Sequence, residues 1–186
     1  MAWRSSASTH AALCENLAAG KVISRGAALN ALIAVDRAAF FPPGLSPSLV
    51  YQDAPYPIGH GATISAPHMH AACVEAVKNQ LVPGARVLDV GSGTGILCAV
   101  FALLVGPTGR VVGVEHVEAL VRASRASLAA VGEGGGALVA AALSCVEVVC
   151  GDGRFGWPAG APYDVIHVGA AAASLPRELV EQLALG

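Results

Sequence analysis

The chain has 186 residues, which fits one domain and argues against two. Hydrophobic residues make up 54% of the chain and charged residues only 13%, so a disordered chain is excluded and a sizeable core is expected. The formal net charge of -2 comes without a run of basic residues, which argues against nucleic acid as an obligate partner.

The first part of the chain is predicted to be a helical layer. Helical periodicity covers residues 8–19 and 24–35, and Ser24 is a plausible N-cap for the second helix. Several prolines interrupt residues 40–60, so we expect a long loop there, and long ordered loops are often functional.

A third helix is predicted from Ser65 to about Leu81. Ser65 is followed by Ala66 and Pro67, which is typical of an N-capped helix with proline in its first turn. From local sequence alone, a plain N-cap is the simplest interpretation of Ser65.

The rest of the chain alternates between short apolar runs and helical segments. Parallel strands are predicted at residues 86–90, 110–115, 145–150 and 164–168, with helices at about 95–105, 117–131 and 175–184. The glycine-rich residues 133–136 are expected to be a flexible link. This order predicts an α/β fold with a doubly wound, mostly parallel sheet in a single domain, with a helical layer at 1–82 and an α/β core at 83–186.

A glycine loop gives the strongest local signal. The predicted strand at 86–90 runs into Gly91, Gly93 and Gly95, whose backbones can approach a ligand closely. Glu115 ends the next strand, where its carboxylate could accept from both hydroxyls of a ribose. A tight turn without a ligand is the alternative for the loop alone.

The spacing favours S-adenosylmethionine over a nicotinamide dinucleotide. A dinucleotide fingerprint needs glycine at position 96, where this chain has Ile96. Asp89, just before the loop, would repel a pyrophosphate and attract the ammonium of a methionine moiety. Asp152 and Gly153 follow the third strand, where the carboxylate could accept from an adenine amine, although a simple turn is the alternative.

Several stretches together resemble the protein-L-isoaspartate (D-aspartate) O-methyltransferase family. The resemblance covers nearly the whole chain, and its most specific part is the unbroken motif Ala62-Thr63-Ile64-Ser65-Ala66-Pro67-His68-Met69-His70-Ala71. The other matching stretches are residues 87–97, 151–154 and 161–170. The glycine loop, by contrast, is shared by many methyltransferases.

The resemblance implies a Rossmann-like class I methyltransferase that repairs damaged proteins. Its donor is S-adenosyl-L-methionine, its product S-adenosyl-L-homocysteine, and its substrate the α-carboxylate of L-isoaspartyl and D-aspartyl residues. By this resemblance Ser65 contacts the substrate carboxylate and is the catalytic residue. The matching cofactor positions are Ala62, Thr63, Ile64, Ser65, His70, Asp89, Gly91, Thr94, Glu115, Asp152 and Gly153, and the loop itself adds Gly93.

The end of the chain departs from the family pattern. Relatives continue into further strands, so we expect this sheet to lack the C-terminal strands, with strand order 3-2-1-4 and residues 164–168 as an exposed apolar edge. A shortened chain would keep its cofactor half-site better than its catalytic competence. A truncated, non-catalytic cofactor binder and a small-molecule methyltransferase therefore remain alternatives.

The remaining residues indicate a cytoplasmic protein without a metal. The five cysteines form no CxxC pair and are expected to be buried, reduced thiols. The longest apolar run, residues 96–105, is too short for a membrane span, so we expect a soluble protein. His68 and His70 point in different directions on a helix, so no metal is expected, while His116 and His167 are expected to pack. The resemblance implies a monomer.

Overall fold

The computed structural model describes residues 5–172 and 174–184, and it divides into two compact units, residues 1–78 and 79–186. The expected boundary between the helical layer and the α/β core, after residue 82, lies close to this division. That the two units form a single domain stays a prediction. In the described part of the chain, no helix combines the length and apolar character needed to cross a membrane.

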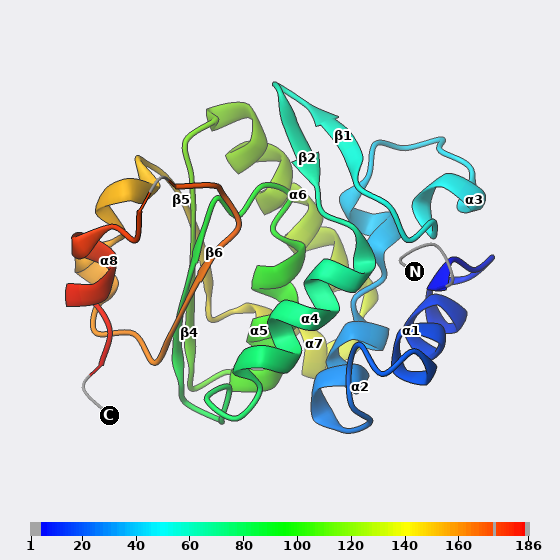
Figure 1. Ribbon diagram of the computed structural model, residues 1–186, viewed down its shortest axis with the longest axis horizontal. Helices are drawn as coiled ribbons and strands as arrows, with labels where there is room; N and C mark the ends of the chain where they lie inside the picture. The colour runs from blue at the N-terminus through cyan, green and yellow to red at the C-terminus, as the bar shows by residue number, and fades with distance from the viewer. Residues whose placement is uncertain (1–4, 173, 185–186) are drawn as a thin grey trace. The chain divides into compact units, whose positions relative to one another are not determined.

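From residue 5 onward, the first unit contains four α-helices and one hairpin. Thr9 caps α1, because its hydroxyl accepts the N–H of Ala12. The antiparallel hairpin pairs Tyr56 with Ile64. The elements are α1 (His10–Ala19), α2 (Ala27–Ala34), the 3-10 helix η2 (Arg37–Phe40), α3 (Pro47–Val50), β1 (Tyr56–Gly59), β2 (Ala62–Ile64) and α4 (Pro67–Val77) (Figure 1).

Two expectations for this unit are wrong. Gly26, and not Ser24, is the N-cap of α2, while the backbone N–H and the hydroxyl of Ser24 both donate to Glu75 at 3.0 Å. The segment 40–60 is not one long loop, because α3 and β1 lie inside it. Proline is compatible with both elements: Pro47 occupies the first turn of α3, and β1 is an edge strand of a two-stranded sheet.

The second unit is built on a parallel sheet of order β5-β4-β3-β6, which confirms the predicted order 3-2-1-4. Its strands are β3 (Arg86–Val90), β4 (Arg110–Glu115), β5 (Val146–Cys150) and β6 (Val165–Val168). Its helices are α5 (Ile96–Val105), α6 (Glu118–Gly134), α7 (Gly136–Leu143), α8 (Arg177–Glu181), η3 (Gly153–Phe155) and η4 (Pro158–Gly160).

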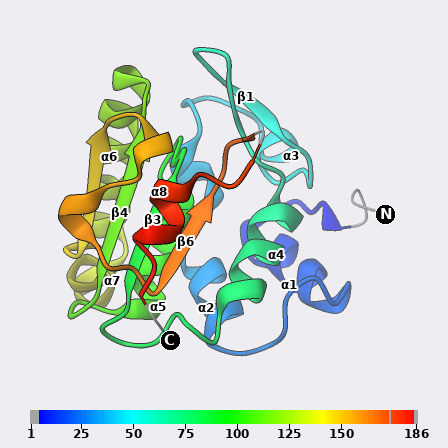
Figure 2. The ribbon, with the colours of Figure 1, turned by 60° about the vertical axis from the view of Figure 1, so that its left-hand side comes forward.

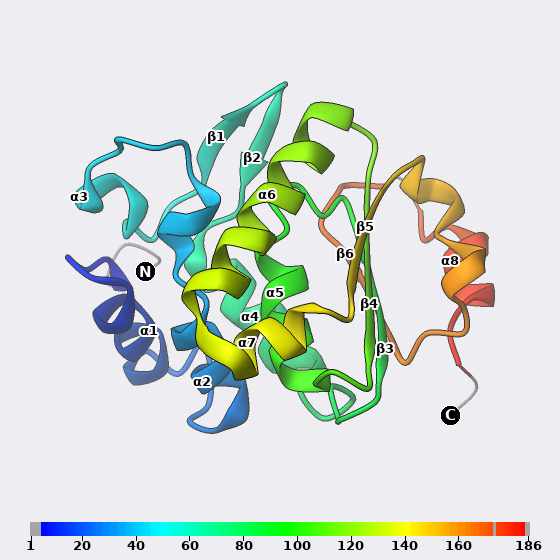
Figure 3. The same cartoon turned by 180° about the vertical axis from the view of Figure 1, so that it is seen from behind.

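Helices cover both faces of this sheet. Figure 1 and Figure 3 show α5, α6 and α7 on one face, and Figure 2 shows α8 on the other. The strands are therefore buried on both sides, which explains their continuous apolar sequences. On the α8 face, Leu179 packs in one cluster with Leu88, Val112 and Tyr163.

The second unit differs from the expectation in three places. The glycine-rich residues 133–136 are not a link to the third strand, because α6 continues to Gly134 and α7 follows. The last predicted helix is only α8, which ends at Glu181. The strand β6 lies at the edge as expected, but its side chains are buried or half-buried, and an isolated parallel bridge joins Tyr163 to Leu183.

Candidate active site

A cavity of about 580 Å³ opens at the carboxyl ends of the four parallel strands of the second unit. This is where open α/β sheets bind ligands, and the volume suits a small molecule. Residues from the end of each strand and from the start of α8 line it: Val90, Gly91, Val114, His116, Cys150, Gly151, Asp152, Gly153, Arg154, Val168, Ala170, Ala171, Ala172, Pro176 and Leu179.

The glycine loop reaches this cavity at Gly91. Gly91, Gly93 and Gly95 have φ values of 74°, 54° and 81°, a region that side chains disfavour. A Cβ atom on Gly91 would lie 3.3 Å from the Cβ of Ala170 across the cavity wall. The loop is thus a backbone cradle that side chains would fill, as close approach of a nucleoside ligand requires.

Glu115 fastens the glycine loop to the end of β4. Its side chain is buried, Oε2 accepts the N–H of Gly93 at 3.0 Å, and Oε1 accepts the N–H of Val117 at 2.9 Å. A carboxylate oxygen has two lone pairs, so both oxygens can also accept a hydroxyl. The predicted ribose contact is compatible with this second, structural role.

Asp89 is not among the residues that line the cavity, although its neighbour Val90 is. Its carboxylate is buried, with Oδ1 at 2.7 Å from Nδ1 of His167 and Oδ2 accepting from the Cys98 thiol at 3.3 Å. Burial and the Asp89 carboxylate raise the pKa of Cys98 well above its ordinary value, so this thiol is unreactive. His167 therefore does more than pack, and the ammonium contact of Asp89 stays a prediction.

Asp152 stands at the start of η3 on the β5 side of the cavity. Its carboxylate accepts from the backbone N–H and the guanidinium of Arg154, and the side-chain bond lowers the pKa of Asp152 to about 2. Next to it, a Cβ atom on Gly153 would collide with Val90, so glycine is required there. The ionised carboxylate is suited to accept from an amine, and this contact also stays a prediction.

The specific motif at residues 62–71 belongs to the first unit. Ala62, Thr63 and Ile64 form β2, and His70 is buried on α4. Ser65 lies in the two-residue link between β2 and α4 and is half-buried. The cofactor contacts assigned to these residues, and to Thr94 of the glycine loop, rest on the resemblance and stay predictions.

Ser65 is not the N-cap of α4, which corrects the sequence interpretation. The N-cap position belongs to Ala66, which has no capping side chain, and Pro67 follows it as the first helical residue. The N–H of His68, which has no partner within the helix, donates instead to Oδ1 of Asp53 at 2.9 Å. The Ser65 hydroxyl makes no hydrogen bond within residues 5–172 and 174–184, so capping does not use it.

Three residues near these sites were missed or misjudged. Asp53 carried no local signal, because its partner lies fifteen positions along the chain. Cys150 is exposed and lines the cavity, so not all cysteines are buried thiols; Cys73 and Cys145 are half-buried. The side chain of His116 is 79% exposed, so it does not pack, and its Nδ1 lies 3.0 Å from Oε1 of Glu115.

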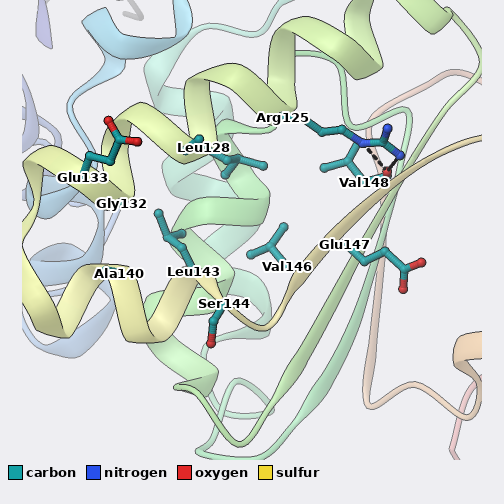
Figure 4. A pocket seen from close by; sticks show the side chains of 11 residues that line it. Arg125, Leu128, Gly132, Glu133, Ala140, Leu143, Ser144, Val146, Glu147 and Val148 are labelled. Atoms are coloured by element: carbon teal, nitrogen blue, oxygen red, sulfur yellow. Dashed lines mark hydrogen bonds between the residues drawn. The ribbon is translucent and has the colours of Figure 1, made fainter.

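A second cavity of about 650 Å³ lies between α6, α7 and β5 (Figure 4). Its walls are mainly apolar, with Leu128, Leu143 and Val146 among them, and the guanidinium of Arg125 donates to the carbonyl of Val148 at 3.0 Å. The residues that line it include none of the glycine loop 91–95, and its carboxylates are Glu133 on α6 and Glu147 near the amino end of β5. The cavity at the glycine loop is therefore the better candidate for the active site.

Comparisons with known proteins show which family the chain belongs to. A family model described as Protein-L-isoaspartate(D-aspartate) O-methyltransferase (PCMT) matches residues 8–186. A protein-L-isoaspartate O-methyltransferase of Triticum aestivum is 48% identical over 94% of this chain and 73% of its own length. One of Caenorhabditis elegans is 44% identical over 100% of this chain and 78% of its own length.

A solved structure shows the same fold. The crystal structure of a protein-L-isoaspartate O-methyltransferase from Plasmodium falciparum in complex with S-adenosyl-L-homocysteine has a TM-score of 0.81. It is 32% identical in sequence and covers 95% of this chain and 80% of its own. With the parallel sheet, the glycine loop and the family match over nearly all residues, the chain belongs to the protein-L-isoaspartate(D-aspartate) O-methyltransferase family.

Proposed function

We propose that this chain transfers a methyl group from S-adenosyl-L-methionine to the free α-carboxylate of L-isoaspartyl residues, and of D-aspartyl residues, in damaged proteins. The family match over residues 8–186 is the observation that carries this proposal. It includes the motif at 62–71, which a small-molecule methyltransferase would not share. The glycine loop alone would leave that alternative open.

The second unit is proposed to hold the donor. Gly91, Gly93 and Thr94 would surround its methionine part, Glu115 its ribose, and Asp152 with Gly153 its adenine. The cradle that a Cβ would fill, and carboxylates at two strand ends, suit a nucleoside with hydroxyls and an exocyclic amine. When bound, the donor supplies an electrophilic methyl group on a sulfonium, which leaves as a neutral thioether.

Ser65 is proposed to orient the acceptor carboxylate. A carboxylate with a reference pKa of about 4 is already ionised near neutral pH, so the reaction needs no general base. The tasks of the enzyme are to position the carboxylate against the methyl group and to remove part of the water around it. The Ser65 hydroxyl, which is not used for capping, can donate one hydrogen bond to a carboxylate oxygen and leave the other oxygen free to attack.

The methyl ester has a defined fate. The backbone amide that follows the modified residue attacks the ester carbonyl and methanol leaves, which gives a succinimide. Hydrolysis of the succinimide by water then restores some normal aspartyl linkage. Methylation therefore starts the repair, and no further group of this chain is required after the ester has formed.

The proposed partners are peptides and proteins that carry isoaspartyl residues. In line with the resemblance, we propose that the chain acts as a monomer in the cytoplasm. Size-exclusion chromatography with light scattering tests whether the chain is a monomer, and a dimer at micromolar concentration would contradict this proposal.

Replacing Ser65 by alanine tests the proposed function. The Ser65→Ala variant should lose about 10-fold or more of its turnover with an isoaspartyl peptide, because the acceptor carboxylate loses its orienting donor. Its affinity for S-adenosylhomocysteine, measured by calorimetry, should stay close to that of the wild type. A variant with unchanged turnover would contradict the role of Ser65.

A further inference from the structure

Asp53 is a buried carboxylate that lies between α3 and β1. Its side chain is 0% exposed, and its own N–H donates to the hydroxyl of Ser6 at 3.0 Å. Oδ1 accepts the backbone N–H of His68 at 2.9 Å and lies 2.8 Å from the imidazole Nδ1 of the same residue. Two contacts on one residue hold Asp53 and His68 in a fixed arrangement.

The backbone of α4 explains why this contact is needed. A helix begins with N–H groups that lack partners inside it. Pro67 has no N–H, and those of Met69 and His70 both donate to the carbonyl of Ala66. The N–H of His68 is thus the one left over in this turn, and Ala66 has no side chain to accept it. Asp53 supplies the missing cap from outside the helix.

A carboxylate suits this position for two reasons. Negative charge is favourable at the positive end of the helix dipole. The buried guanidinium of Arg37 also interacts with it: burial lowers the pKa of Arg37 to about 10, while the charge of Asp53 acts in the opposite direction. Both residues are almost completely buried, so each partly offsets the cost of burying the other's charge.

The contact closes the base of the β1–β2 hairpin. Asp53 precedes β1, and His68 follows the link in which Ser65 lies. On one side of the link, Ile64 is fixed by its pairing with Tyr56; on the other side, His68 is fixed by Asp53. Ser65 is therefore held between two anchored residues.

From this arrangement we propose that Asp53 is a positioning residue for the Ser65 hydroxyl. It fixes the backbone of the link, and because it caps α4 itself, it leaves the hydroxyl of Ser65 available for the substrate. The inference rests on the proposed function, since it needs Ser65 to contact the acceptor carboxylate.

The test compares Asp53→Ala with Asp53→Asn in methyl transfer to an isoaspartyl peptide. Without the cap, kcat should fall about 10-fold or more, because small misplacements of a reacting group are costly. The affinity for S-adenosylhomocysteine should not change. Asparagine keeps an acceptor oxygen for the N–H of His68, so Asp53→Asn should recover most of the kcat.

Asp36→Asn is the matched control. Asp36 also caps a helical turn in the first unit, with Oδ1 accepting the N–H of Ala38 at 2.9 Å, and the hydroxyl of Tyr51, which lies outside the β1–β2 hairpin, donates to the same carboxylate at 3.2 Å. This variant should keep the wild-type kcat. If Asp53→Asn does not fold because Arg37 is left without a counter-charge, the double variant Arg37→Met/Asp53→Asn removes both buried charges and keeps the cap.

A double variant separates positioning from general stability. If Asp53 acts through Ser65, then Asp53→Ala should cause no further loss of kcat in the Ser65→Ala background. Losses that multiply, or an Asp53→Ala variant with wild-type kcat, would overturn the inference. If Ser65→Ala alone keeps full activity, the proposed role of Ser65 fails instead, and the two failures are distinguishable.

Discussion

Glu115 makes structural contacts at the end of β4 and is also the residue proposed to contact the ribose. It holds the glycine loop through the N–H of Gly93 and the start of α6 through the N–H of Val117. The proposed ribose contact would add hydroxyl donors to the same oxygens. A residue that both builds the cradle and contacts the ligand is expected to be sensitive even to a nearly isosteric change.

Glu115→Gln is therefore predicted to weaken the binding of S-adenosylhomocysteine. One carboxylate oxygen is replaced by an amide that cannot accept, so about 1–3 kcal/mol of binding free energy should be lost. Glu147→Gln is the control, because Glu147 is an exposed carboxylate on β5 that pairs with Arg110. Calorimetry should show a change only for Glu115→Gln, and equal affinities of both variants would contradict the prediction.

Ionisation of the buried Tyr163 phenol is expected to lower the stability of the folded protein at alkaline pH. Its hydroxyl donates to the carbonyl of Trp157 at 2.7 Å, and burial raises the pKa of Tyr163 to about 12. An unfolded tyrosine ionises at about pH 10, so its contribution to stability is complete below that pH and is lost as the pH rises towards 12.

In Tyr163→Phe, the melting temperature should decline less steeply than in the wild type between about pH 10 and 12. Near neutral pH the variant should be less stable by about 1–2 kcal/mol, because the carbonyl of Trp157 loses its donor. Thermal melts across this pH range measure both effects. Parallel curves for the two proteins would show that the phenol does not cause the alkaline loss.

At the scale of elements, the glycine loop determines where α5 begins. Gly95 is the N-cap of α5 with a φ of 81°, and a Cβ atom there would lie 3.2 Å from the Cβ of Ser124 on α6. Both the backbone conformation and the approach of α6 therefore favour glycine. The fold and the cradle depend on the same residue.

Gly95→Ala is predicted to lower the free energy of unfolding by about 1–3 kcal/mol. Gly134→Ala is the control, because Gly134 lies in α6 and its Cβ would have no atom within 4 Å. That change should be neutral or stabilising by up to about 1 kcal/mol. Urea unfolding measures both values, and an equally stable Gly95→Ala would contradict the assigned strain.

The sequence predicts some elements much better than others. The four strands of the second unit and their order were correct, because strands buried on both faces are continuous apolar runs separated by helices. The helix α7 was missed because it begins at the last of three consecutive glycines, although Ala137–Leu143 are mostly good helix formers. The hairpin was missed because prolines dominate its surroundings.

The candidate site shows the same contrast. The spacing predicted that the glycine loop and Glu115 lie at the ends of two strands, and the structure places them there with the N–H of Gly93 bonded to Glu115. Their contacts with a ligand stay predictions. The cap of α4 was misassigned to Ser65, because the true cap, Asp53, is brought there by the hairpin between them. Contacts between residues that a hairpin brings together from distant positions in the sequence leave no periodic signal.

At the scale of the whole molecule, the predicted cofactor residues divide between the two units, and the proposed acceptor contact Ser65 lies in the first. The cavity with the glycine loop lies within residues 79–186, and Ser65 with its motif lies within residues 1–78. Variants of Glu115 and of the glycine loop should therefore act mainly on donor affinity, and variants of Ser65 and Asp53 mainly on turnover.

The transfer of labelled methyl from S-adenosyl-L-methionine to two peptides that differ only in one linkage tests the central claim most directly. The account predicts that the isoaspartyl peptide becomes labelled, with base-labile ester, and that the normal aspartyl peptide does not. Equal labelling of both peptides, or of neither at saturating donor, would contradict it.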